Sequence, residues 1–139
     1  MHLHRHHVRH RHLRRTRTER GDASIEVVIA VPVLLLMIML VIQAGLWFHG
    51  SQLAEAAAQE GVQAGRVVDG RVGDAEGRAR EFLVRLSPSV AASAQVRASR
   101  TPEVTRVEVT SRVQQVVPGL VLTVSGSAEA PTERFREDR

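Results

Sequence analysis

The sequence predicts an α+β, membrane-anchored fold in which a long N-terminal helix leads into a small folded domain. One segment is apolar without interruption from Val27 to Ile42, and it follows a basic leader. The pattern after it has a helical period as far as Leu86 and a period of two from Gln95 onward. The expected order is therefore a transmembrane helix that continues outward, a second short helix, and an antiparallel sheet of about three strands.

The leader, residues 1–21, is rich in histidine and arginine and contains a single acid, Glu19. Positive charge ahead of a span resists transfer across the bilayer and keeps the N-terminus in the cytoplasm. Downstream of the span the arginines and acids balance, so the net charge of +4 belongs to the leader and gives little support for a nucleic-acid partner. We expect a single-pass protein of the cell membrane, with a cytoplasmic N-terminus and an extracytoplasmic C-terminus.

The predicted transmembrane helix covers residues 22–48. At about 1.5 Å per residue, the part from Val27 to Phe48 is roughly 33 Å long, which is enough for a hydrocarbon core of about 30 Å. The apolar run is longer than that of a signal peptide, which has about 7 to 15 residues. Gln43 and Gly45 have two interpretations that stay open, namely a position near the outer interface and a contact with another helix.

The helix is predicted to continue through residues 49–69, because this stretch is rich in alanine and contains no proline. A stripe of small side chains runs along it and would let another backbone approach closely. We interpret this stripe as a packing surface for other helices or a sheet, and it consists of Ala54, Ala58, Gly61 and Gly65.

A small α+β domain is predicted over residues 74–130. Its helix is expected from Asp74 to Leu86, because the apolar residues there share one face and Pro88 follows. Strands are expected at residues 95–99 and 104–113, where apolar and polar residues alternate, and a third is expected from Leu120 to Ala130. The charged tail, residues 131–139, is expected to fray.

The sequence offers few groups for catalysis or ligand binding. Cysteine is absent, and the one histidine outside the leader, His49, has no catalytic or metal-binding motif around it. We therefore predict no enzyme activity, no cofactor and no small-molecule substrate. An alternative is a metal-binding or sensory function of the leader, with candidate ligands His2, His4, His6 and His7.

An acid lies at the start of the apolar run. Glu26 in the first turn of a helix is favoured by the helix dipole, by about 0.3 to 1 kcal/mol. At the edge of a bilayer, however, a carboxylate is costly unless a positive group meets it. If the chain were cut after Gly21, the new amine of Asp22 would be such a group, in the same chain or in a neighbouring one.

The segments ERGDASIEVVIAVPVLLLMIML and AAAQEGVQAGRV together resemble the TadE-like pseudopilins of tight-adherence (Flp) pilus systems, over roughly residues 19–68. A basic leader that ends in glycine, followed five residues later by glutamate and an apolar run, also resembles the type IV prepilin processing pattern. The resemblance implies a pilin-like fold and cleavage between Gly21 and Asp22 by a prepilin peptidase. It makes Glu26 the fifth residue of the mature chain. Asp22 departs from the pattern, because it begins the mature chain with an acid.

The resemblance also implies a function in pilus assembly. The implied partners are the membrane, the prepilin peptidase, other pilus or pseudopilin subunits and assembly-platform proteins. A second hypothesis from the residues alone is an unprocessed, signal-anchored scaffold protein of the cell envelope. N-terminal sequencing of the native protein distinguishes the two, because only the first predicts a chain that starts at Asp22.

Overall fold

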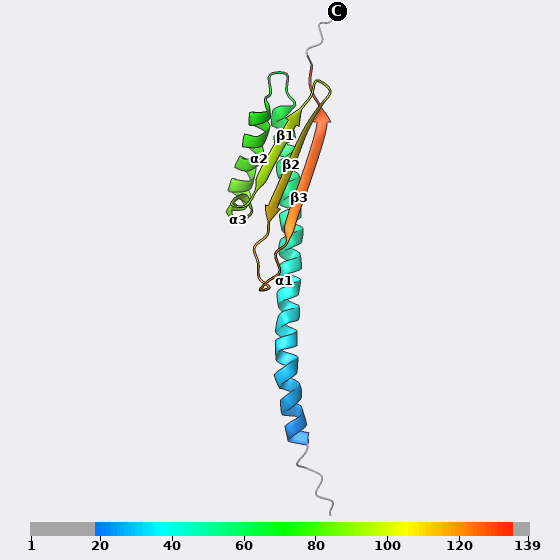
Figure 1. Ribbon diagram of the computed structural model, residues 1–139, viewed down its shortest axis with the longest axis vertical. Coiled ribbons are helices and arrows are strands. Elements are labelled where there is room, and N and C mark those ends of the chain that lie inside the picture. Colours follow the sequence, from blue (N-terminus) through cyan, green and yellow to red (C-terminus); the bar gives the residue numbers. More distant parts are fainter. Residues whose placement is uncertain (1–18, 135–139) are drawn as a thin grey trace, which may run out of the picture. The chain divides into compact units, whose positions relative to one another are not determined.

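The computed structural model describes the backbone of residues 19–134 and the side chains of residues 25–134. The predicted α+β fold is confirmed: a long apolar helix is followed by a shorter helix and a three-stranded antiparallel sheet (Figure 1). The elements are α1 (Glu19–Gly65), α2 (Val72–Leu86), α3 (Pro88–Ala91), β1 (Gln95–Arg100), β2 (Val104–Arg112) and β3 (Thr123–Pro131). Contacts divide the chain within α1, so that residues up to Leu36 belong to one unit and residues from Met37 onward to another.

The sheet has β2 in its centre, paired antiparallel with β1 and with β3. Along β2 the odd-numbered residues from Thr105 to Ser111 are buried and the even-numbered ones are exposed. One face of the sheet is therefore apolar and the other polar. On the polar face, Arg106 donates a hydrogen bond to Glu129 of β3, and this bond raises the pKa of Arg106 above its ordinary value.

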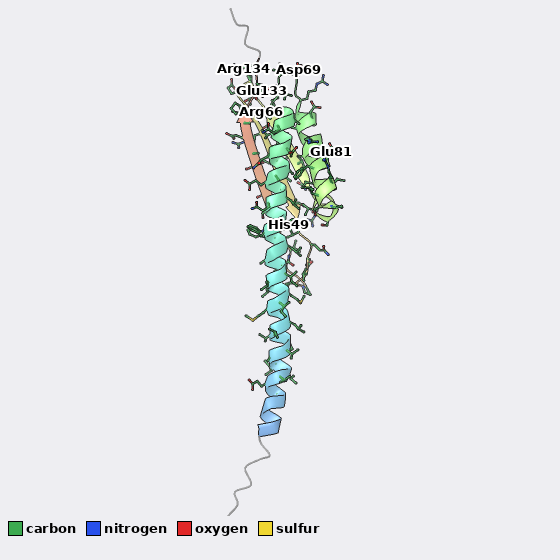
Figure 2. All side chains as sticks on the ribbon, turned by 180° about the vertical axis from the view of Figure 1, so that it is seen from behind. His49, Arg66, Asp69, Glu81, Glu133 and Arg134 are labelled. Atoms are coloured by element: carbon green, nitrogen blue, oxygen red, sulfur yellow. The ribbon has the colours of Figure 1, made fainter. Side chains whose placement is uncertain are left out.

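The final turns of α1 and the whole of α2 cover the apolar face of the sheet. Figures 1 and 2 view the domain from opposite sides, and both show the two helices on the same side of the strands. From α2, Ala75, Ala79 and Leu83 are fully buried. The other core residues come from α1, from Val90 of α3 and from the strands and their ends: Leu53, Ala54, Ala57, Ala58, Val62, Val90, Val96, Val107, Val109, Val113 and Val124. The domain thus begins well before residue 74, because α1 supplies part of its core.

The helix boundaries differ from the prediction in two places. α1 ends at Gly65 instead of residue 69, because the chain turns back so tightly that a Cβ at Gly70 would lie 2.7 Å from the carbonyl oxygen of Gly65. α2 begins at Val72 instead of Asp74. The carboxylate of Asp74 accepts a hydrogen bond from the backbone N–H of Arg71 at 2.9 Å, which caps the first turn of the helix.

Three further boundaries differ after α2. Pro88 ends that helix as predicted but also begins the four-residue helix α3. β3 begins at Thr123 instead of Leu120, because the preceding residues form a loop along α1. The predicted fraying of the tail is wrong for residues 131–134: β3 continues to Pro131, and the N–H of Glu133 donates to the carbonyl of Arg66 at 2.8 Å.

Candidate functional site

The first part of α1 exposes an unbroken apolar surface. From Ile25 to Ile42 every large apolar side chain other than Met39 is exposed. Within the described residues, α1 is the one helix that is long and apolar enough to cross a membrane. Its most apolar 18-residue window contains no buried residue. A core helix of a soluble protein would bury such a window, so the exposure is typical of a helix that lipid surrounds.

The predicted processing residues lie at the N-terminal end of this surface. Gly21 and Asp22 are helical residues near the beginning of the described part of α1, where only the backbone is described. Glu26 is exposed one turn later.

Gln43 lies where the apolar surface ends, and its side chain is almost fully buried. Its Oε1 accepts hydrogen bonds from the N–H groups of Val116 at 2.7 Å and Val117 at 3.3 Å. Its Nε2 donates to the carbonyl of Gln114 at 3.2 Å. Within the chain, Gln43 therefore does not join two helices. It ties α1 to the connection between β2 and β3, residues 113–122, which we call the interface loop.

The predicted packing stripe is buried inside the same chain. Ala54 and Ala58 have no exposed surface, and Gly61 and Gly65 are buried as well. A Cβ at Gly61 would lie 2.8 Å from the carbonyl oxygen of Ala75, and a Cβ at Gly65 would lie 2.8 Å from the Cβ of the same residue. Only glycine permits so close an approach. The stripe brings α2 and the sheet onto α1, so it is not available to a second subunit.

Two residues that the sequence analysis did not single out complete this packing. Gly126 of β3 crosses α1 so closely that a Cβ there would collide with the backbone of Ala54 and Glu55. A glycine inside a predicted strand is a recognisable sign of such an approach. Arg100 donates hydrogen bonds to the carbonyls of Val67 at 2.9 Å and Val68 at 3.3 Å, just beyond α1, whose last turn has no basic residue. Its positive charge complements the C-terminal end of the helix.

The candidate metal ligands His2, His4, His6 and His7 lie outside the described residues. Within the described part of the chain, no three side chains of the metal-binding types come together. His49 is exposed on α1, away from the labelled charged residues (Figure 2). The non-catalytic nature of the protein stays a prediction.

Comparison with known proteins finds a similarity in the first part of the chain. The family model described as TadE-like protein matches residues 21–63, slightly less than one third of the sequence. No curated protein and no solved structure matches the chain significantly. The match begins at Gly21, runs through the apolar surface and Gln43, and includes the packing stripe except Gly65. The resemblance to the TadE-like family is thereby confirmed for this part, because the family model matches residues 21–63.

Proposed function

We propose that the chain is a pseudopilin that acts in the assembly of tight-adherence (Flp) type pili or a related secretion apparatus. The match of residues 21–63 to the TadE-like model is the observation that carries this proposal. The exposed apolar surface from Ile25 to Ile42 supports a single membrane span. The arginine-rich leader would stay in the cytoplasm, and the domain that follows the span would lie on the other side.

The proposed processing step is hydrolysis of the peptide bond between Gly21 and Asp22 by a prepilin peptidase. The matched segment begins at Gly21, and the bond precedes the exposed apolar surface of α1. Cleavage would give Asp22 a free α-amine, which carries a positive charge at neutral pH because its pKa is ordinarily about 8. Glu26 lies four residues later, about one helical turn from this amine. The new amine would offset the cost of this carboxylate at the edge of the bilayer.

The proposed contacts between subunits lie on the apolar part of α1. The packing stripe is occupied by the chain's own α2 and sheet. Several residues that α1 leaves exposed beside the stripe are polar, namely Gln52, Glu55, Gln59 and Gln63. The exposed residues from Ile25 to Ile42 are therefore the part of α1 best suited to pack against helices of other subunits in the membrane.

N-terminal sequencing tests the processing step. A C-terminally tagged chain is expressed with and without a prepilin peptidase, and we expect a mature form that starts at Asp22 only when the peptidase is present. Gly21→Arg should leave the precursor uncut and abolish pili. Gly77→Ala is a suitable control, because Gly77 is exposed on α2 with nothing within 4 Å of its Cβ position. An intact chain starting at Met1 in piliated cells would instead support an unprocessed envelope scaffold.

A further inference from the structure

The interface loop has an unusual composition for a surface connection. Its sequence is VQQVVPGLVL, and no charged residue occurs between Arg112 and Glu129. Val121 is 60% exposed, and Val116, Val117 and Leu120 are half-buried. Surface loops are ordinarily polar, and an exposed apolar patch on a domain marks a surface that meets another apolar phase or partner.

The loop descends along α1 toward the apolar run (Figure 1). Val113, at its start, lies at the level of Gly50, because a Cβ at that glycine would be 2.6 Å from the Val113 side chain. Gln114, Val116 and Val117 are hydrogen-bonded to Gln43, which lies seven residues before Gly50 on the helix. At about 1.5 Å per residue, the loop therefore reaches roughly 10 Å below the end of the sheet.

The helix beside the loop is apolar as well. Phe48 is 61% and Trp47 44% exposed, and the indole N–H of Trp47 donates to the carbonyl of Thr123 at 3.3 Å, next to the loop. Tryptophan is enriched at the boundary between membrane and water. The segment from Ile25 to Ile42, with 18 residues, is about 27 Å long, close to the thickness of a hydrocarbon core. Gln43 and the loop then fall at the level of the lipid headgroups.

The loop is also suited to an apolar medium because the protein itself satisfies several of its backbone groups. Gln43 accepts from the N–H groups of Val116 and Val117. The N–H of Leu120 donates to the carbonyl of Val117 at 3.1 Å, and the N–H of Val113 donates to Leu122 at 3.1 Å. Irregular backbone is tolerated next to lipid only when its polar groups have such partners.

We propose that the interface loop is a second membrane contact, which inserts Val121 and its apolar neighbours into the boundary between headgroups and acyl chains. The occupant of this surface is lipid. The inference rests on the membrane anchor of the proposed function. It adds that the domain contacts the bilayer surface itself, through the loop.

The absence of cysteine from the chain makes a fluorescence test straightforward. Val121→Cys, Leu35→Cys and Ser127→Cys variants of the full chain are each labelled with an environment-sensitive nitrobenzoxadiazole dye and reconstituted into vesicles of phosphatidylethanolamine and phosphatidylglycerol. Lipids with a spin label at a shallow or a deep position serve as quenchers. Ser127 lies exposed on the polar face of the sheet and is the control for a water-exposed position. Leu35 reports on the span itself.

We expect the dye at position 121 to emit at a shorter wavelength than at position 127, and to be quenched more by the shallow than by the deep spin label. At position 35 the deep label should quench more. If position 35 is quenched while position 121 behaves like position 127, the loop proposal is overturned and the anchor stands. If position 35 is not quenched, the anchor itself fails. A dye at position 121 that is blue-shifted but not quenched would show that protein, and not lipid, covers the loop. This result would also overturn the proposal.

A second variant checks the structural basis of the contact. Gln43→Leu removes the hydrogen bonds that hold the loop beside α1. Combined with Val121→Cys, it should reduce the shallow quenching, whereas Gln59→Leu at an exposed position of α1 should not. Equal quenching in both double variants would contradict the arrangement inferred here.

Discussion

At the scale of single residues, Gln43 is a polar side chain placed where an apolar helix meets a folded domain. All three of its hydrogen bonds go to backbone groups of the interface loop. Among the described residues, every buried side-chain nitrogen and oxygen has a hydrogen-bond partner, and this includes both polar atoms of Gln43. Removal of such a residue leaves buried backbone groups unpaired, and these are costly.

Gln43→Leu should therefore destabilise the domain by about 1 to 3 kcal/mol. The N–H groups of Val116 and Val117 lose their acceptor, so their hydrogen exchange should become faster. Chemical unfolding in detergent, followed by the fluorescence of Trp47, measures the change in free energy of unfolding, because this is the one tryptophan of the chain. Gln59→Leu should leave both readouts unchanged. Unaltered exchange at Val116 in Gln43→Leu would show that the side chain does not hold the loop.

Gly126 is a residue whose lack of a side chain lets two elements meet. We expect Gly126→Ala to destabilise the domain by about 1 to 3 kcal/mol or more, because the new Cβ meets the backbone of Ala54 and Glu55, which cannot rotate away. Gly77→Ala is the matched control. Its Cβ meets nothing and replaces glycine inside a helix, so it should stabilise by roughly 0.5 to 1 kcal/mol. Thermal unfolding followed by circular dichroism measures the change in stability of both variants. A Gly126→Ala variant as stable as the parent would refute the close crossing.

At the scale of elements, α1 has two successive functions along its length. Up to Ile42 it exposes apolar side chains on all sides, and from Gly50 onward it presents small residues to the sheet and α2. Its ion pair with α2, between Glu60 and Arg78 at 3.0 Å, is exposed, so it adds little to stability. The close packing of small side chains is what holds the two helices together.

Ala58→Leu should accordingly destabilise the domain by about 1 to 3 kcal/mol, since there is no space for a larger side chain at a fully buried position of the stripe. Gln59→Leu, at the next and exposed position, should change the free energy of unfolding by no more than about 0.5 kcal/mol. Urea titration of the two variants in the same detergent measures the free energy of unfolding of each. If Ala58→Leu is as stable as the parent, the stripe is not packed within the chain.

At the scale of the whole molecule, the internal use of the stripe limits where subunits can pack against one another. Single cysteines at Leu34 or Val41, on the exposed apolar surface, should form disulfide-linked products with other cysteine-bearing subunits under oxidising conditions. A cysteine at Ala58 should not, because that position is fully buried. Non-reducing electrophoresis of membranes from piliated cells reads the result. Crosslinks at position 58 alone would mean that the domain opens to assemble.

The sequence by itself determined the apolar run, the two main helices, the three strands and the resemblance to the TadE-like family, because each of these is a local pattern of residue types. A continuous apolar segment, a period of 3.6 and a period of two are all visible without knowledge of the fold. Gly126 is also a sign in the sequence, because a glycine inside a predicted strand often marks a place where another backbone approaches closely.

Only the tertiary structure decided what the stripe, Gln43 and the interface loop contact. A stripe of small residues fits a neighbouring subunit as well as the chain's own sheet, and the bonds of Gln43 join residues 71 to 74 positions apart. Partners at such separations are chosen by the packing of the whole domain and leave no periodic mark in the sequence. For the same reason the interface loop is recognisable as apolar from its residues, but its place beside the end of the apolar helix is known only from the fold.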